Sequence, residues 1–274
     1  MELARGKMDN EKVMDGEITK SQQDLPIYRE AGRAIGVCFE HITVVGVAAG
    51  ENTVLDFGAV LQYLVSFPIN LVRRFAGNKK PALRDLIHDV SGVVPAGEML
   101  LVLGTPGAGC STTLRAISSN TESFVQVDGS VSYSSISSID IQKYYRSEVV
   151  FNGENDTHFP SLTVGNTMDF ALKLRKPAKD KESTKSFSSE MSNKLLKSFN
   201  IAHTVKTVVG NAFVRGVSGG ERKRISLAEV LATNPAVACW DQPNRGLDSS
   251  SALDFFRMLK AMSRRTGMAN IVTM

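Results

Sequence analysis

The chain has 274 residues, of which 42% are hydrophobic, and a formal net charge of +4 at pH 7. This length is enough to bury a substantial core and suits one elaborated domain better than two large ones. The small basic excess gives no reason to expect a nucleic-acid partner. Three widely spaced cysteines, Cys38, Cys110 and Cys239, exclude a disulfide framework or a zinc site and favour a reducing compartment.

Residues 1–30 are polar, and we expect them to form an N-terminal tail ahead of a folded domain that covers residues 31–274. The first part of this tail has no apolar stretch flanked by basic residues, so it resembles neither a signal peptide nor a membrane anchor. Residues 37–45 then alternate and are rich in β-branched and aromatic side chains, which predicts a strand.

Residues 46–80 are predicted to be an insertion in the domain. Within them, residues 54–72 are the only stretch that approaches membrane-spanning length. Polar or helix-breaking residues interrupt this stretch at Asp56, Gln62, Pro68 and Asn70. Such groups are costly in hydrocarbon, so we expect an amphipathic segment that packs on the domain rather than a membrane span.

Residues 104–112 read GTPGAGCST, which differs by one letter from the phosphate-binding loop G-x-x-x-x-G-K-[ST]. Gly104, Gly109 and Ser111 match the pattern, whereas Cys110 stands where the lysine should be. The flanking sequences predict a buried strand (GEMLLVLG) before the loop and a helix (STTLRAISS) after it, which is the context that a phosphate loop requires. A glycine-rich turn without a ligand is the alternative that this motif leaves open.

The chemistry of such a loop comes mainly from its backbone. Glycines allow successive N–H groups to point at phosphate oxygens, the helix N-terminus adds partial positive charge, and the Ser111 hydroxyl is suited to Mg²⁺. The candidate nucleotide-binding residues here are Gly104, Pro106, Gly107, Ala108, Gly109, Cys110, Ser111 and Thr112.

Helical periodicity dominates the second half of the chain. Residues 164–174 and 191–199 predict two helices separated by a polar linker, and we assign residues 162–216 to a helical subdomain. Further on, RKRISLAEVLAT and SALDFFRMLKAMSRR predict helices, AVACW predicts a short buried strand, and GMANIVTM predicts the start of another strand.

Two more motifs add chemistry to the loop. Asp241 ends the AVACW strand, where a carboxylate can meet a loop-bound Mg²⁺. Ser218, Gly219 and Gly220 of VSGGE open a helix and present hydroxyl and N–H donors to an anion. Alone, each motif also suits an ordinary turn or helix cap, but their order along the chain, followed by GLDS at residues 246–249, is far more specific.

This ordered set resembles the nucleotide-binding domain of ATP-binding cassette (ABC) transporters, with VSGGE as the signature motif, VACWDQ as the second Walker motif and GLDS as the D-loop. The motifs GTPGAGCST, NGENDTHFPSLTVGNTMDFAL and WDQPNRGLDSSSAL are similar to the N-terminal nucleotide-binding domain of fungal pleiotropic drug resistance (ABCG-like) transporters. The resemblance runs from about residue 81 to the end. It implies an α/β P-loop NTPase fold with a mixed sheet core, an antiparallel β portion and a helical subdomain.

The resemblance further implies ATP and Mg²⁺ as cofactors, and a second nucleotide-binding domain and transmembrane domains of the same transporter as partners, at the cytoplasmic face of a membrane such as the plasma membrane. It implies that the C-terminal part of the domain, including a switch histidine, is missing from this chain. A soluble cassette ATPase without membrane spans, or a truncated product that binds nucleotide weakly, remain the alternatives.

At three positions in or near the phosphate loop, the residue differs from the one that a catalytically active site of this family has. Cys110 offers a weak donor in place of an ammonium charge. Gln242 stands in the position of the catalytic glutamate and has no carboxylate to accept a proton. Glu154 replaces the glutamine that couples the nucleotide site to the membrane domain. We therefore expect little hydrolysis at a metal site formed by Ser111, Asp241 and Glu154.

The signature motif, in contrast, is intact. Domains of this family pair head to tail, so that each nucleotide lies between the loop of one domain and the signature of the other. The resemblance thus implies that Ser218, with Gly219 and Gly220, completes a competent catalytic site in trans, while Gln242 marks the degenerate catalytic position of this chain.

Overall fold

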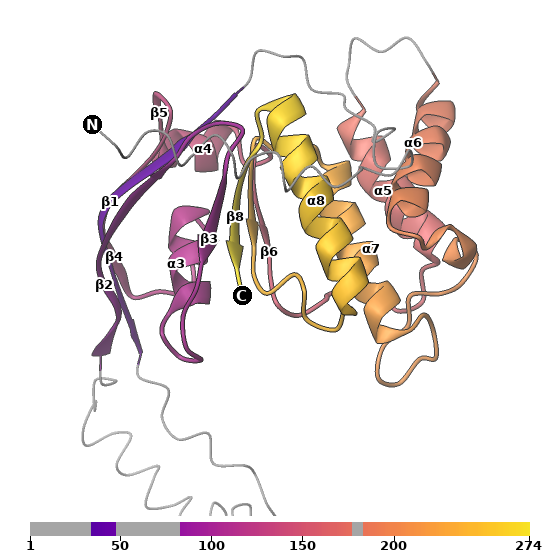
Figure 1. The fold of residues 1–274 in the computed structure, drawn as a ribbon, viewed down its shortest axis with the longest axis horizontal. Helices are drawn as coiled ribbons and strands as arrows, with labels where there is room; N and C mark the ends of the chain where they lie inside the picture. The colour runs from indigo at the N-terminus through magenta and orange to yellow at the C-terminus, as the bar shows by residue number, and fades with distance from the viewer. Residues whose placement is uncertain (1–33, 48–82, 177–182) are drawn as a thin grey trace, which may run out of the picture.

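The computed structural model describes residues 34–47, 83–176 and 183–274 (Figure 1). The predicted tail, nearly all of the predicted insertion and the apolar stretch at residues 54–72 lie outside these residues. The described chain folds into two four-stranded sheets with helices between and beside them. This arrangement is the α/β fold with a mixed sheet content that the sequence predicts.

The first sheet is antiparallel and has the strand order β2-β1-β4-β5. The strand predicted over residues 37–45 is confirmed as β1. Its apolar side chains alternate along the strand and are buried on one face of the sheet. His41 and Asp89 adopt left-handed backbone conformations (φ 52° and 51°) where the pairing of β1 and β2 shifts register. The strands are β1 (Val37–Val47), β2 (Leu83–Val94), β4 (Gln126–Tyr133) and β5 (Ile136–Ser137).

The second sheet is parallel throughout, with the order β3-β8-β7-β6. Its side chains divide between two cores. Val237 and Cys239 belong to the cluster around α3 and the antiparallel sheet, whereas Ala238 and Trp240 belong to the cluster around α7 and α8. β7 and β8 are buried along their whole length, which explains why they are short and mainly apolar. The strands are β3 (Met99–Val102), β6 (Val149–Asn152), β7 (Val237–Trp240) and β8 (Ala269–Thr273).

The predicted burial of the strand before the phosphate loop is wrong in part. β3 lies at the end of the described parallel sheet and pairs with β8. Since it has a neighbour on one side, Leu101 is 49% exposed and Leu103, just beyond the strand, is 69% exposed.

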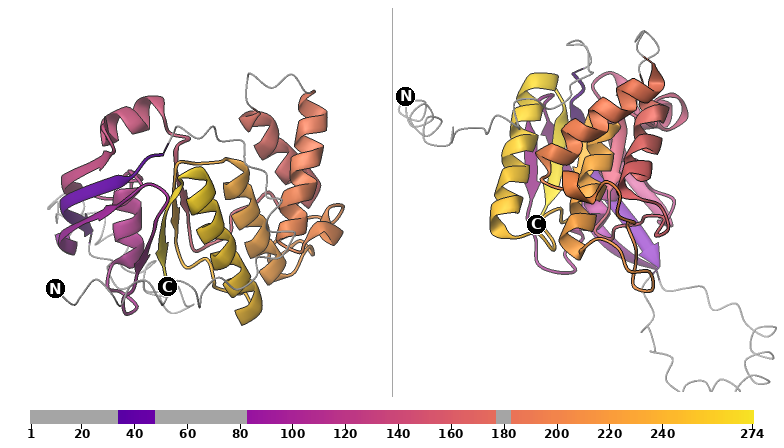
Figure 2. Two further views of the ribbon diagram at one scale, coloured as in Figure 1. Left: turned by 45° about the horizontal axis from the view of Figure 1, so that its top comes forward. Right: turned by 90° about the vertical axis from the view of Figure 1, so that its right-hand side faces the viewer.

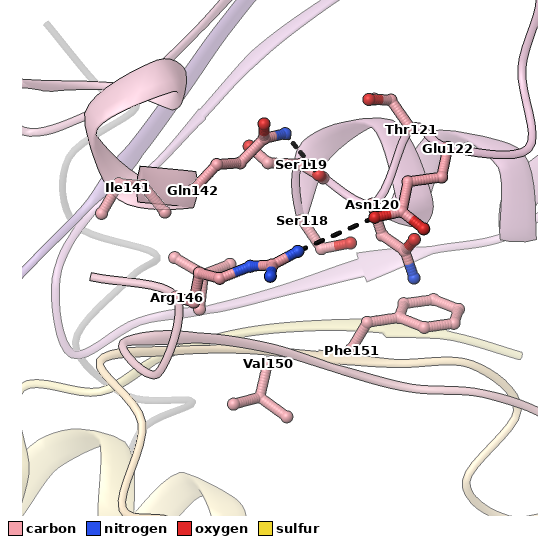
Figure 3. A pocket seen from close by; sticks show the side chains of 11 residues that line it. Ser118, Ser119, Asn120, Thr121, Glu122, Ile141, Gln142, Arg146, Val150 and Phe151 are labelled. Atoms are coloured by element: carbon pink, nitrogen blue, oxygen red, sulfur yellow. Dashed lines mark hydrogen bonds and ion pairs between the residues drawn. The ribbon is translucent and has the colours of Figure 1, made fainter. Parts of the chain in front are cut away.

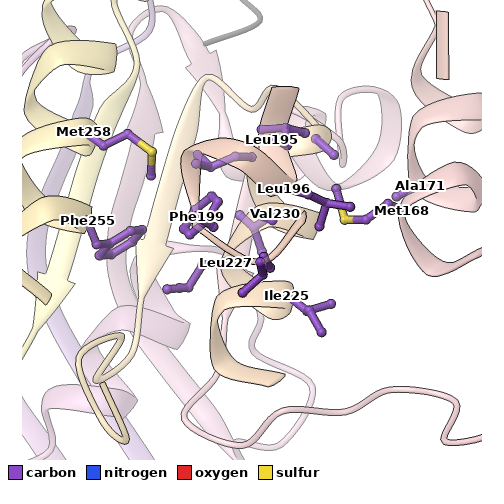
Figure 4. Packing of buried hydrophobic residues seen from close by; sticks show 14 of the residues in the cluster. Met168, Ala171, Leu195, Leu196, Phe199, Ile225, Leu227, Val230, Phe255 and Met258 are labelled. Carbon is purple, nitrogen blue, oxygen red and sulfur yellow. The ribbon is translucent and has the colours of Figure 1, made fainter. Parts of the chain in front are cut away.

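Helices fill the space between the sheets and cover the far side of the parallel sheet. α3 lies between the two sheets, and α5 and α6 lie at the opposite end of the molecule from the antiparallel sheet (Figures 1 and 2). Side chains of α6, α7 and α8, such as Leu196, Leu227 and Phe255, interlock in one core (Figure 4). The helices are α3 (Cys110–Ile117), α4 (Ser138–Tyr144), α5 (Val164–Arg175), α6 (Thr184–Ser198), the 3₁₀ helix η1 (Ala202–Thr204), α7 (Gly219–Ala232) and α8 (Ser249–Thr266).

The helices predicted after the phosphate loop and in the second half of the chain are confirmed, with one correction. α6 begins at Thr184, well before residue 191, so part of the predicted polar linker is helical. The Ser183 hydroxyl caps this helix by accepting the Ser186 N–H, and Phe187 in the first turn is buried. The first turn of α6 was not predicted because most of its side chains are polar. A single apolar residue, Phe187, does not produce a helical periodicity in the sequence.

A buried polar bridge joins β7, β8 and α8. The Trp240 Nε1–H donates to Asn270 Oδ1 at 2.7 Å, and Asn270 Nδ2 donates to Ser263 Oγ at 2.6 Å. All three side chains are almost completely buried. Asn270 therefore satisfies an indole N–H and a hydroxyl that water cannot reach, which fixes the position of α8 against the sheet.

The start of α7 is fixed by a capping box. The Ser218 hydroxyl accepts the Glu221 N–H at 3.3 Å, and Glu221 Oε2 accepts the Ser218 N–H at 2.8 Å. Glu221 Oε1 also lies 2.9 Å from His203 Nε2 of η1. The backbone and hydroxyl hydrogen bonds from Ser218, followed by the one with His203, lower the pKa of Glu221 from 4.5 to about 2.

Replacing Asn270 by leucine tests the buried bridge. The variant keeps the volume but leaves the Trp240 N–H and the Ser263 hydroxyl without this partner, so we expect a loss of about 2–4 kcal/mol in the free energy of unfolding. Urea denaturation of the variant and of Asn193→Leu, a matched change on the exposed face of α6, measures it. Equal stability of the two variants would contradict the role of the bridge.

Glu221→Gln tests the capping box through its pH dependence. A carboxylate whose pKa is lowered on folding stabilises the fold fully above its unfolded pKa, and this contribution disappears as the pH falls through the folded value. The difference in unfolding free energy between wild type and variant should thus shrink as the pH is lowered from about 5 to about 2. Glu190→Gln, at an exposed ion pair on α6, is the control. A constant difference would rule out the carboxylate charge as the cause.

Candidate functional site

The loop between β3 and α3 has the backbone that a phosphate site needs. Gly107 and Gly109 have left-handed conformations (φ 85° and 90°), and Gly109 is the N-cap of α3. A Cβ at residue 109 would lie 2.5 Å from Ile87 Cγ2 and 3.0 Å from the Leu86 carbonyl oxygen of β2. This position therefore needs glycine for both its conformation and its contact with the antiparallel sheet.

The loop borders a hollow of about 480 Å³ at the carboxyl end of the parallel strands. All of the predicted loop residues except Ala108 line it, together with three residues that follow β7 or end β8. Within the described part of the chain, none of the side chains that line it is charged. They are Gly104, Thr105, Pro106, Gly107, Gly109, Cys110, Ser111, Thr112, Gln242, Thr273 and Met274.

Ser111 and Asp241 meet, as predicted. The Ser111 hydroxyl donates to Asp241 Oδ1 at 2.9 Å, and the Thr273 hydroxyl donates to the same oxygen at 2.9 Å. Asp241 is 3% exposed. A carboxylate and a hydroxyl are the hard oxygen ligands that Mg²⁺ prefers, and Mg²⁺ is commonly held by one carboxylate together with substrate phosphates. The residues present therefore fit a Mg²⁺ ion.

Thr273 was not predicted as a site residue. It ends β8, and it also accepts the Gln242 N–H at 3.0 Å. Thr273 thus orders Asp241 and Gln242 together from the neighbouring strand. The sequence signal that points to it is weak, since it is a lone threonine at the end of an apolar run.

Gln242 lines the hollow directly after Asp241 and has a left-handed backbone conformation (φ 46°). Its side-chain amide has no basic oxygen that could accept a proton from water. The assignment of Gln242 to the position of a catalytic glutamate stays a prediction.

Cys110 occupies the first position of α3 with its thiol close to the loop. A Cβ at residue 104 would lie 2.6 Å from Cys110 Sγ, so Gly104 leaves the room that the sulfur occupies. The cysteine is free and partly exposed. The loop therefore presents a small thiol at the position where the phosphate-loop pattern has a lysine.

Glu154, the third predicted metal ligand, has other partners in the described structure. Its carboxylate pairs with Arg245, in the loop after β7, and its carbonyl oxygen accepts from Lys223 Nζ at 3.3 Å. It does not line the hollow. The predicted role of Glu154 in binding metal stays a prediction, and its observed partner is one that the sequence did not indicate.

The signature residues form a separate face. Ser218 and Gly219 are exposed at the N-terminus of α7, and Gly219 has open space around the position of a Cβ. A Cβ at Gly220 would lie 3.1 Å from the Gly246 carbonyl oxygen, so the signature and the D-loop are in contact. None of these residues lines the phosphate-loop hollow. The signature residues and the phosphate loop therefore lie on two distinct surfaces of the described structure.

A second polar hollow, of about 390 Å³, lies at the other end of α3 (Figure 3). Residues 118–122, Gln142 and Arg146 border it, and Arg146 pairs with Glu122 at 3.7 Å on the surface. It faces the carbonyl end of the helix, which carries partial negative charge. A phosphate group is better placed at the N-terminal end, in the loop hollow.

Among the helices of the described residues, none combines the length and the apolar character that a bilayer crossing requires.

Comparison with known proteins agrees with this geometry. The family model "ABC transporter" matches residues 87–245. Over 98% of the present chain, the sequence is 43% identical to the ABC multidrug transporter atrF of Aspergillus flavus. Over 84% of the chain, it is 44% identical to ABC transporter G family member 15 of Dictyostelium discoideum. Over 86% of the chain, it is 39% identical to the ATP-dependent permease PDR12 of Saccharomyces cerevisiae. It spans 18%, 16% and 16% of these relatives, respectively. The chain belongs to the ABC transporter family and is similar to the nucleotide-binding part of its multidrug, G-type members.

Proposed function

We propose that this chain is a nucleotide-binding domain that couples ATP binding and hydrolysis to the export of small hydrophobic compounds. The observation that carries the proposal is the contact between Ser111 and Asp241 beside the phosphate loop, because it joins a phosphate cradle to a metal ligand. Mg²⁺ bound there would neutralise phosphate charge. The multidrug transporters and the permease among its relatives support the export role, in which membrane domains bring the chain to the cytoplasmic face of a membrane.

The phosphate-loop site of this chain binds ATP with little hydrolysis. The side chains that line its hollow include no lysine or arginine to stabilise developing charge and no aspartate or glutamate to accept a proton. Cys110 and Gln242 leave the backbone geometry in place while removing both charged groups. Binding through backbone N–H groups remains possible, since it depends on the loop conformation.

The signature face acts on a second nucleotide. Ser218 and Gly219 are exposed, and the N-terminus of α7 behind them carries partial positive charge. Residues of a second nucleotide-binding domain would supply the phosphate loop and the glutamate opposite this face. The chain thereby contributes to hydrolysis in trans.

Cys110→Lys tests the cause of weak nucleotide binding at the loop. We expect MgATP to bind about tenfold more tightly, because an ammonium group would face the phosphates. Titration of the purified chain with a fluorescent ATP analogue measures the affinity. Cys110→Met, an uncharged side chain of similar length, is the control and should show no gain. A gain in both variants would assign the effect to length rather than charge.

Ser218→Arg and Gln242→Ala test the division between the two faces. We would place each in a chimera in which this chain replaces the homologous segment of the Aspergillus flavus transporter and measure the ATPase rate. The bulky arginine blocks the face that completes the second site, so the rate should fall at least about tenfold, whereas Gln242→Ala should change it less than about twofold. The reverse pattern would show that the faces are assigned the wrong way round.

A further inference from the structure

A line of polar side chains, three of them almost completely buried, joins α7 to the loop that follows β6. We call it the polar seam, and it consists of Asp156 and His158 of the loop and Lys223, Ser226 and Glu229 of α7. The three α7 residues are spaced three apart and so share one face of the helix. The same helix carries Ser218 at its N-terminus, and the same loop carries Glu154.

Lys223 anchors one end of the seam. Its side chain is 2% exposed, and its ammonium group lies 3.6 Å from Asp156 Oδ1, 3.4 Å from the Gly153 carbonyl oxygen and 3.3 Å from the Glu154 carbonyl oxygen. An ammonium group has three N–H donors, and three acceptors surround this one. Burying an ammonium group costs free energy unless it has such partners. These contacts therefore hold the loop backbone against α7.

His158 anchors the other end. The Ser226 hydroxyl donates to Asp156 Oδ1 at 2.7 Å, so His158 Nε2, 2.8 Å from the same hydroxyl oxygen, is the donor in that hydrogen bond. The His158 side chain is 3% exposed, and its Nδ1 lies 3.4 Å from Glu229 Oε2. Ser226 is therefore the central member, in contact with both loop side chains.

These contacts have a mechanical consequence for the signature face. The loop can separate from α7 only if several buried polar groups lose their partners together, and each such group carries the cost of an unmade hydrogen bond. α7 is a continuous helix from Gly219 to Ala232, so a displacement at Ser226 is transmitted to Ser218 at its end.

We propose that the polar seam makes the loop at residues 153–158 and the N-terminus of α7 one rigid unit, and that Ser226 and Lys223 are positioning residues for Ser218. The unit is a property of the fold alone, whereas its effect on hydrolysis rests on the proposed function of Ser218 in trans.

Hydrogen exchange of the full 274-residue chain tests the rigid unit without any nucleotide. Ser226→Ala removes the central hydroxyl and leaves the apolar packing intact. We expect amide exchange to become about tenfold faster both in residues 153–158 and in residues 221–225, the first residues of α7 whose N–H groups have hydrogen-bond acceptors. Acceleration in only one of the two segments, or in neither, would overturn the proposal.

Ser188→Ala is the matched control. Ser188 of α6 is also buried, and its hydroxyl donates to Asp169 Oδ1 of α5 at 2.6 Å, so the same chemistry is removed from a contact outside the seam. Neither segment should exchange faster in this variant. If Ser226→Ala increases amide exchange throughout the chain, a milder variant is needed. Glu229→Gln, at the exposed end of the seam, serves this purpose. It should increase amide exchange in the same two segments by a smaller factor.

A second arm addresses the effect on hydrolysis in the chimeric transporter. Ser226→Ala and Lys223→Met should lower kcat several-fold, while the affinity of the loop in this chain for a fluorescent ATP analogue stays unchanged. A fall in affinity with unchanged kcat would show that the seam serves the phosphate loop instead. Faster exchange without an effect on kcat would retain the rigid unit and refute the positioning of Ser218.

Discussion

The buried carboxylate of Asp241 is the constraint on which this structure depends. It stands at the end of β7 with two hydroxyl groups on one of its oxygens, one from the helix after the phosphate loop and one from the adjacent strand β8. An unpaired buried carboxylate would be very costly, so β7, β8 and α3 must keep one relative position. The parallel order of these strands brings their carboxyl ends to one edge, and the phosphate loop opens at the same edge.

The loop after β6 forms two ion pairs with other segments near this edge. Glu154 pairs with Arg245, so its negative charge is balanced by a cation from the loop after β7. Lys223 neutralises Asp156 within the interior. The loop after β6 is thus held from two sides by cations from two other segments. The conformation of this loop is therefore fixed by contacts with α7 and with the loop after β7.

Several features of the site could be predicted from sequence because they rest on local patterns. Glycines that need left-handed conformations predicted the phosphate loop, and an apolar run that ends in an aspartate predicted Asp241. The rest depends on contacts between distant segments. β6 is too short to show a period, Thr273 has no motif around it, and the partnership of Glu154 with Arg245 arises where two loops meet. The burial of Lys223 could not be predicted from the sequence either, because this lysine stands in a run of charged residues.

The edge of the parallel sheet formed by β3 has a consequence for handling the protein. Among the described strands, β8 alone pairs with β3, and Leu101 and Leu103 are exposed beside the open backbone. An unpaired strand with apolar side chains recruits other strands and promotes aggregation. The exposed apolar side chains along this strand therefore favour self-association of the purified chain as its concentration rises.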